Sequence, residues 1–308
     1  MIKTMMNFKR FLLDDKEMYE KYFNADVCVR GCEFSFANMY LWGRQNFAEV
    51  NGHIVMFSQF NQKTVYPFPI GAGDKKAVVD AIIEDAEARG IPCRITGLCK
   101  GAKQTLERLY PEKFRFHSDE GSFDYVYAID DLAELQGKKY DGKRGHIAKF
   151  KVACPGYVCE PINDGNVALV YEMIDAWYSE RLAKNPDADF HMERAALKKA
   201  IRDRDALEME SLVIKFEGEI MALTLGSFLT DDTLDVQFEK ARTDVPGAYT
   251  VVNNEFARYI REKYPNVKYL DREEDMGLEG LRKAKKSYHP HHMIKKYWAC
   301  LLEDGCDY

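Results

Sequence analysis

The chain lacks any run of apolar residues long enough to cross a bilayer. Its most apolar stretch, residues 211–228, is interrupted by Lys215, Glu217 and Glu219, whereas a membrane-spanning helix needs about 20 largely apolar residues. Residues 1–17 lack the apolar core and the cleavage site of a secretory signal peptide. We therefore expect no stable membrane insertion and a cytoplasmic location.

The chain also lacks an excess of positive charge and a recognisable metal-binding pattern. Its formal net charge is -6, which does not favour general or sequence-specific DNA binding. Its eight cysteines are scattered over 308 residues, a distribution that indicates free thiols rather than a disulfide framework. No cysteine set has the spacing of a zinc site, and His289, His291 and His292 lack a helical i, i+4 pair. We expect no metal.

Apolar residues, by contrast, are plentiful. They make up 46% of the chain, and aromatic residues make up 13%, a composition that favours a substantial core over disorder. A length of 308 residues suits two domains of ordinary size or one large domain.

Two segments of the chain follow a similar order of predicted elements. The first half has a hairpin that turns at Asn51-Gly52, a strong hairpin signal, and the second half has one that turns at Glu217-Gly218. After each hairpin the pattern predicts strand, helix, strand, helix, strand. In the first half these elements are 64–71, 75–89, 91–98, 103–110 and 114–129; in the second half they are 234–241, 249–264, 267–270, 278–288 and 292–302. Two further helices, 167–183 and 193–203, precede the second hairpin.

Each half should therefore form a mixed α/β domain. A hairpin pairs its strands antiparallel and a strand–helix–strand crossover pairs them parallel, so each sheet should be mixed. We place the domains at 1–140 and 141–308. The Gly-rich and charged segment 137–144 between them is typical of a linker or a binding loop.

Several motifs narrow this interpretation to a known family. They are residues 34–42, 66–71, 142–151, 238–241, 247–257, 271–277 and 281–290. With them the chain resembles an uncharacterised bacterial family grouped with the C-terminal domain of phosphatidylglycerol lysyltransferase. The resemblance implies tandem GNAT-like (acyl-CoA N-acyltransferase) domains. It also implies acyl or aminoacyl transfer to an amine or hydroxyl, from a coenzyme A thioester or an aminoacyl-tRNA, as in Fem-type transferases.

The resemblance assigns catalytic and donor-binding roles within the second half. In GNAT proteins the loop that matches residues 242–248 presents backbone N–H groups to a pyrophosphate at a helix N-terminus, so Arg242, Val245, Gly247 and Ala248 are candidates for cofactor binding. A Tyr at the place of Tyr288 often gives a proton to the leaving thiolate. Residues 242–248 also fit an ordinary helix start, and Tyr288 also fits a core position.

Charged residues of the second half supply the other candidates. Glu239, late on a predicted strand, has the chemistry of a base for the attacking amine, although it also fits a solvent-facing position. Residues 271–275 follow a predicted strand, at the end where ligands of α/β sheets bind. The candidates for substrate binding are Arg272, Glu274, Asp275, Arg282 and Lys285, with a solvated loop and helix face as the alternative.

Two further functional classes stay open. A degenerate tandem scaffold could bind a ligand or a protein partner without catalysis, or serve as a dimeric structural protein. Transfer chemistry requires Glu239 and Tyr288 for turnover, whereas a binding module keeps its ligand when both are changed.

Overall fold

A computed structural model describes residues 5–26, 31–60 and 63–305, and the chain divides into two compact units. Unit 1 comprises residues 1–124, 274–278 and 294–308, and unit 2 comprises residues 125–273 and 279–293. Both units are discontinuous because the chain crosses between them several times. The simple division after residue 140 did not anticipate these crossings.

Unit 1 is built on a seven-stranded mixed sheet with the order β1-β2-β3-β4-β5-β14-β6. Its one parallel pair is β4–β5, and the other pairs of this sheet within the described residues are antiparallel. The elements are β1 (Lys9–Arg10), η1 (Leu13–Asp15), α1 (Lys16–Asn24), η2 (Cys32–Phe34), α2 (Phe36–Trp42), β2 (Gln45–Val50), β3 (His53–Phe60), β4 (Lys63–Pro67), α3 (Lys75–Arg89), β5 (Arg94–Leu98), α4 (Lys100–Leu109), β6 (Phe114–His117), η3 (Glu120–Ser122), β14 (Tyr297–Leu301) and η5 (Leu302–Asp304).

Unit 2 repeats this plan with the sheet order β13-β7-β12-β11-β10-β9-β8. Here β11 and β12 pair in parallel. The elements are β7 (Asp124–Ala128), α5 (Ile129–Glu134), η4 (Lys138–Tyr140), α6 (Asp141–Ala153), β8 (Val158–Glu160), α7 (Val167–Lys184), α8 (His191–Asp203), β9 (Glu210–Phe216), β10 (Glu219–Thr230), β11 (Thr233–Ala241), α9 (Ala248–Lys263), β12 (Tyr269–Asp271), α10 (Glu279–Lys286) and β13 (His292–Ile294).

The predicted fold class, mixed α/β in two similar halves, is confirmed. Both hairpins form at the predicted turns, where Asn51 and Gly52 have φ of 49° and 72°, the left-handed values that a two-residue hairpin turn requires. The helix predicted over 75–89 has those bounds, with Asp74 as its N-cap and Gly90 after its end.

Three predicted segments have a more complex structure than the sequence indicated. Residues 114–129 form two strands, β6 and β7, and residues 292–302 form β13 and β14; in each case one strand belongs to each sheet. The period of a strand does not reveal that its two ends pair in different sheets. The segment 137–144, predicted as a linker or a binding loop, holds η4 and the start of the 13-residue helix α6.

The described part of the chain contains both free and disulfide-bonded cysteines. Cys32, Cys93, Cys99, Cys154 and Cys159 are free thiols, as predicted, but Cys300 is disulfide-bonded, so the prediction is wrong there. None of the helices in the described ranges has both the length and the apolarity needed to span a bilayer.

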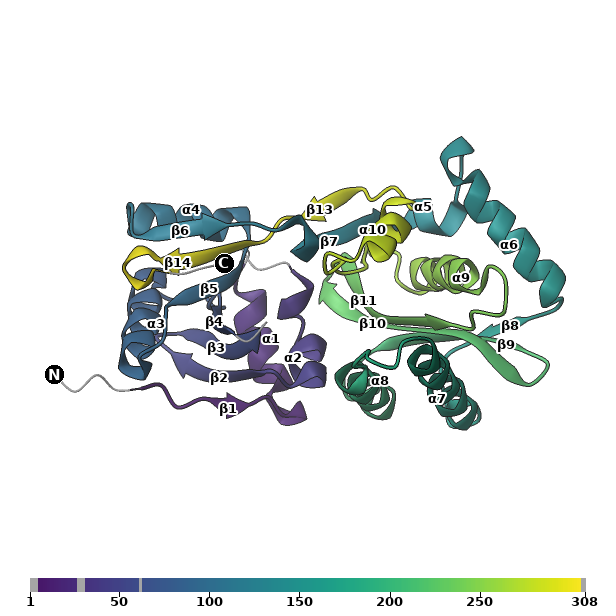
Figure 1. Ribbon diagram of the computed structural model, residues 1–308, viewed down its shortest axis with the longest axis horizontal. Coiled ribbons are helices and arrows are strands. Elements are labelled where there is room, and N and C mark those ends of the chain that lie inside the picture. The colour runs from purple at the N-terminus through teal and green to yellow at the C-terminus, as the bar shows by residue number, and fades with distance from the viewer. Residues whose placement is uncertain (1–4, 27–30, 61–62, 306–308) are drawn as a thin grey trace. The chain divides into compact units, whose positions relative to one another are not determined.

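The sheet of unit 2 is covered on both faces (Figure 1). Helix α9 packs on one face, and α7 and α8 lie on the other. Phe256 and Ile260 of α9 pack against Leu234 and Val236 of β11 in a buried cluster. Burial of such side chains stabilises the fold by about 1.5–3 kcal/mol each. This packing fixes α9, and the strand beneath it, as the frame for the site described next.

Candidate active site

Three of the predicted site residues, Glu239, Arg272 and Tyr288, lie close together in unit 2. Arg272 donates from Nη2 to Oε1 of Glu239 at 2.9 Å, and Asn253 donates from Nδ2 to Oε2 at 3.3 Å. The guanidinium carbon of Arg272 lies 5.0 Å from the centroid of the Tyr288 ring. Glu239 is on β11, Arg272 follows β12 and Tyr288 follows α10, so three elements converge here. We call Glu239, Arg272, Tyr288 and Lys143 the unit 2 polar centre.

Strand alternation explains why Glu239 faces α9. Successive residues of a strand point to opposite faces; Glu239 reaches Asn253 of α9, while its neighbour Lys240 pairs with Glu193 of α8. The Lys240 ammonium also lies 4.3 Å from the centroid of the Trp177 ring.

Glu239 and Arg272 are mostly shielded from water. Their side chains are 13% and 14% exposed, and burial opposes the charge on Arg272, but Glu239 and the two nearby phenols outweigh it and raise the pKa of Arg272. The Nη1 atom of Arg272 and the Oδ1 atom of Asn253 are buried without a hydrogen-bond partner. Buried polar atoms of this kind are costly in an empty apolar interior, so they suit a centre that receives a polar group.

Tyr288 is a protonated phenol at neutral pH. Burial raises its pKa, Arg272 and a hydrogen bond with Thr250 lower it, and the net effect is an increase above the usual value. The Tyr288 carbonyl accepts a hydrogen bond from the Tyr140 hydroxyl at 3.0 Å. A buried phenol that keeps its proton is suited to donate it.

Lys143 is the member of the polar centre that the sequence did not single out as a site residue. It is on α6, and its Nζ lies 3.5 Å from the centroid of the Tyr288 ring and donates to Oγ of Ser287 at 2.7 Å. The only sequence signal was its place in a basic cluster beside Tyr140. A cluster of that kind is usually a solvated face, so the contact of Lys143 with Tyr288 could be recognised only in the folded structure.

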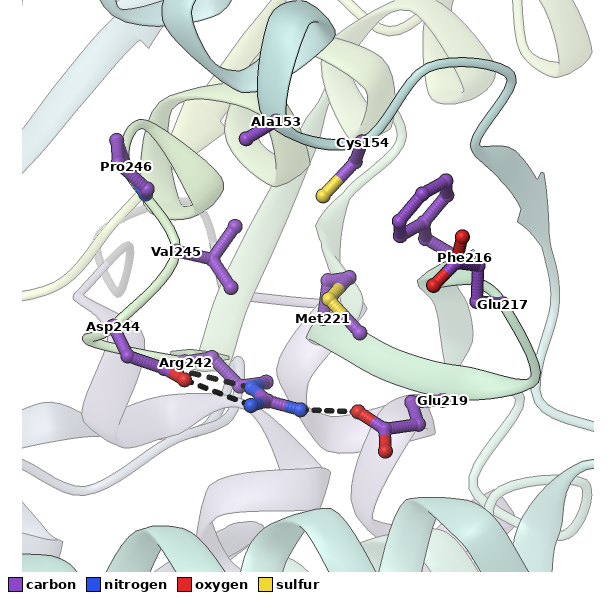
Figure 2. Close-up of a pocket in the computed structure, with 10 residues that line it drawn as sticks. All are labelled: Ala153, Cys154, Phe216, Glu217, Glu219, Met221, Arg242, Asp244, Val245 and Pro246. Carbon is purple, nitrogen blue, oxygen red and sulfur yellow. Dashed lines mark hydrogen bonds and ion pairs between the residues drawn. The ribbon is translucent and has the colours of Figure 1, made fainter.

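The predicted cofactor-binding loop has a different character in the structure (Figure 2). Arg242 donates to both carboxylate oxygens of Asp244, at 3.1 and 2.8 Å, and also to Glu219. These hydrogen bonds, that with Asp244 above all, raise the pKa of Arg242. Arg242 and Val245 line a surface pocket together with Cys154, Phe216 and Met221. Glu217, Glu219 and Asp244 also line it, so one cation faces three carboxylates.

The start of α9 is covered by α6. Gly247 is its N-cap with φ of +82°, and a Cβ at this position would lie 2.2 Å from the His146 carbonyl oxygen. The close approach that Gly247 permits is therefore made by α6. Ala248, the first residue of α9, is buried. A pyrophosphate at this helix start would meet a carbonyl oxygen and excess negative charge, both unfavourable for an anion.

The other predicted substrate-binding residues are distributed between the two units. In unit 2, Lys285 is buried and donates to the main-chain carbonyls of Arg272 and Glu273, which holds the segment after β12. Arg282 is half-buried on the same helix, α10. Glu274 and Asp275 belong to unit 1, where the Asp275 carboxylate accepts the Gly277 N–H at 2.8 Å.

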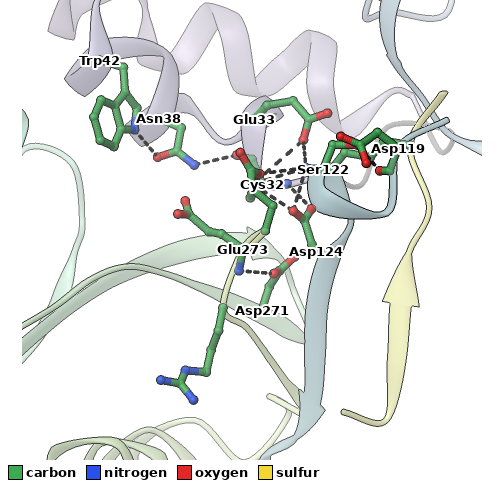
Figure 3. Close-up of polar contacts among 12 residues, drawn as sticks. Cys32, Glu33, Asn38, Trp42, Asp119, Ser122, Asp124, Asp271 and Glu273 are labelled. Carbon is green, nitrogen blue, oxygen red and sulfur yellow. Dashed lines mark hydrogen bonds and ion pairs between the residues drawn. The ribbon is translucent and has the colours of Figure 1, made fainter. Parts of the chain in front are cut away.

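Unit 1 contains a separate cluster of Cys32, Glu33 and Asp124, which Figure 3 shows, beside the buried Lys296. Cys32, Glu33 and Asp124 bring possible metal-ligand atoms within 4.8 Å of one another. The Lys296 ammonium donates to Asp124 at 2.6 Å, and it pairs with Glu33 at 2.7 Å and with Glu274 at 3.5 Å. Burial disfavours its charge, but Asp124 and its neighbours outweigh burial and raise its pKa. A cation, the ammonium itself, thus already lies among these oxygens.

Comparison with known proteins gives both a family and a fold. The model of the family described as "Phosphatidylglycerol lysyltransferase, C-terminal" matches residues 25–300. A conserved protein of unknown function from Bacteroides thetaiotaomicron is 35% identical, with a TM-score of 0.88 over 96% of this chain and 100% of that one. No curated protein matches the chain.

Two more distant structures share the fold. L-PGS from Bacillus licheniformis is 15% identical, with a TM-score of 0.67 over 95% of this chain and 93% of that one. FemX is 12% identical, with a TM-score of 0.59 over 97% of this chain and 98% of that one.

Proposed function

Because the chain belongs to the phosphatidylglycerol lysyltransferase C-terminal family, we propose that unit 2 transfers an aminoacyl group from an aminoacyl-tRNA to an amine or hydroxyl acceptor. The observation that carries the proposal is the convergence of Glu239, Arg272 and Tyr288. Transfer from an ester requires a proton for the leaving oxygen and positive charge near the developing oxyanion. Tyr288 supplies the first and Arg272 the second.

The contacts of Glu239 favour a positioning role over that of a base. Arg272 and Asn253 each donate to one of its carboxylate oxygens. Both carboxylate oxygens of Glu239 are therefore already engaged in holding other side chains. We therefore assign Glu239 to holding the guanidinium of Arg272 against the ring of Tyr288.

The charge distribution favours a tRNA donor over a coenzyme A thioester. The Arg242 loop, where a coenzyme A pyrophosphate was predicted, has its cation paired with Asp244 and Glu219. Exposed cations instead gather where η4 and α6 meet the end of α10; His289 contacts the Lys139 carbonyl there at 3.3 Å. We call this the basic face; its residues are Lys138, Lys139, Arg144, Lys283 and Lys286. Lys139 pairs with Asp131 and Arg144 with Asp141, so cations outnumber carboxylates here, unlike in the Arg242 loop. Such a face attracts a phosphate backbone.

The test is a transfer assay with tRNA charged separately with each of several radiolabelled amino acids. Acceptors are offered by class: an anionic glycerophospholipid, a peptide with a free amine, and a small amino alcohol. We expect label to leave the tRNA and enter one acceptor class, and Tyr288→Phe to lower kcat by about 10²–10⁴-fold, the usual contribution of a positioned acid. Tyr171→Phe, a partly exposed tyrosine of α7, is the matched control.

Two outcomes would contradict the proposal. If acetyl-coenzyme A, and no charged tRNA, serves as donor, the tRNA assignment is wrong. If no donor reacts although the protein is folded by circular dichroism, the family member acts as a binding module, the alternative to catalysis.

A further inference from the structure

The environment of Lys143 is unusual for a lysine. Its ammonium lies against the ring of Tyr288 at 3.5 Å and donates to the hydroxyl of Ser287 at 2.7 Å, and both of these groups are neutral. Arg272 approaches the same ring, with its guanidinium carbon 5.0 Å from the centroid. Two cations therefore share one aromatic ring, and the nearby carboxylate of Glu239 is already paired with Arg272.

The charged groups around Lys143 act in opposite directions. From the segment after β12, Arg272 repels the ammonium; from β11, Glu239 attracts it; from the end of α10, Tyr288 contributes a neutral phenol. On α6 itself Asp141 pairs with Arg144. Burial first, and then Arg272, lower the pKa of Lys143 to about 8, and Glu239 only partly opposes them.

This environment brings the pKa of Lys143 close to neutral pH. With a pKa of about 8, the Lys143 side chain carries a neutral amine near neutral pH far more often than an ordinary lysine with a pKa of about 10.4. Glu239 accepts two hydrogen bonds and Tyr288 keeps its proton. Within the polar centre, Lys143 is the group suited to accept a proton.

We propose that Lys143 takes the proton of the attacking amine or hydroxyl in the transfer reaction; this inference rests on the proposed function. The nucleophile's lone pair forms the new bond to the ester carbonyl carbon, and its proton passes to the neutral amine of Lys143. The ester C–O bond breaks, and Tyr288 gives its proton to the departing ribose oxygen. The Lys143 ammonium then returns a proton to the Tyr288 oxygen, directly or through water. The net result is one proton moved from nucleophile to leaving group.

The first test measures the protonation of Lys143 without any turnover. Lysines of the full chain are reductively ¹³C-methylated, and their resonances are followed by NMR from pH 6 to pH 11. We expect one signal to titrate near pH 8 and to be absent from Lys143→Arg. If the signal lost in that variant titrates near pH 10, the assignment of Lys143 is overturned.

The second test measures the pH profile of transfer. The wild type should lose activity below about pH 8, as the Lys143 amine becomes protonated. Lys143→Met should lower kcat by about 10²-fold or more. Lys143→Arg should be equally inactive, because a guanidinium keeps the positive charge but does not release its proton at these pH values. Lys184→Met, an exposed lysine of α7, is the control.

The outcomes separate this inference from the proposed function. Transfer in Lys143→Arg with the wild-type pH profile overturns the role of Lys143 and leaves the transfer function standing. Absence of transfer from every charged tRNA overturns both. Melting temperatures of the variants within a few degrees of the wild type establish that loss of activity is not loss of folding.

Discussion

Replacing Gly247 with alanine tests the packing of α6 over the start of α9. The residue has φ of +82°, so any side chain adds a left-handed backbone strain of about 1–2 kcal/mol. The new Cβ would also lie 2.2 Å from the His146 carbonyl oxygen and 2.9 Å from its carbon. Both atoms are backbone, so relief requires α6 to move away from α9, as in an overpacked core, at a further cost of about 1–3 kcal/mol.

Gly218→Ala is the matched control for the strain alone. Gly218 has φ of +83°, and a Cβ there would have no heavy atom within 4 Å. We expect Gly218→Ala to lower the free energy of unfolding by about 1–2 kcal/mol and Gly247→Ala by about 2–5 kcal/mol. For a chain of this size each kcal/mol corresponds to roughly 2–4 °C in Tm.

The assay is differential scanning calorimetry of both variants and the wild type in one buffer. The difference between the two variants isolates the contact with His146, because the backbone strain is common to both. Equal Tm losses in the two variants would refute the reasoning, since they would mean that α6 does not pack on Gly247. The start of α9 would then be open to a phosphate, as the family resemblance implied.

Three further predictions concern the ion pair, the buried acid and the basic face of unit 2. Glu239→Gln should lower the free energy of unfolding by about 3 kcal/mol, because it leaves the buried Arg272 unpaired, and the double variant Glu239→Leu/Arg272→Met should recover part of that loss in urea denaturation. Burial opposes the charge on Glu210, but hydrogen bonds from Tyr264, Lys263 and Tyr259 outweigh it and lower its pKa. The stabilisation by Glu210 is therefore full above its unfolded pKa of about 4.3 and disappears as the pH falls through the lower folded value. Glu210→Gln should cost about 2 kcal/mol at pH 7 and progressively less as the pH falls below about 4.3, and a cost that does not depend on pH would contradict this. Lys283→Gln/Lys286→Gln should reduce the slope of log K against log salt for tRNA binding by about 1.4–1.8, whereas Lys76→Gln/Lys100→Gln in unit 1 should leave it unchanged; equal slopes in all three proteins would mean that tRNA docks elsewhere.

Local signals in the sequence were sufficient to predict the two hairpins and the helix over 75–89. The turn at Asn51-Gly52 and the cap residues Asp74 and Gly90 act within a few residues of themselves, so both hairpins and the helix over 75–89 could be predicted. The sequence could not predict that β7 joins the sheet of unit 2 and β14 the sheet of unit 1. Pairing partners far apart in the sequence leave no local periodicity.

The same distinction applies to the site. Glu239 and Arg272 were predicted from their places late on a strand and after a strand, and Tyr288 from the family resemblance; the fold brings the three together. Lys143 could not be predicted, since its ring contact joins residues 145 positions apart in the sequence. For Gly247 the resemblance implied a helix start that faces a pyrophosphate, but not that the His146 carbonyl of α6 lies against it.

The most direct test of the central claim is the rate at which labelled aminoacyl-tRNA loses its label to an acceptor, with the wild type and with Tyr288→Phe. The account predicts transfer by the wild type and a loss of about 10²–10⁴-fold in kcat for the variant, with Tyr171→Phe unchanged. Equal transfer by the wild type and Tyr288→Phe would contradict it, because the chemistry would then take place outside the unit 2 polar centre.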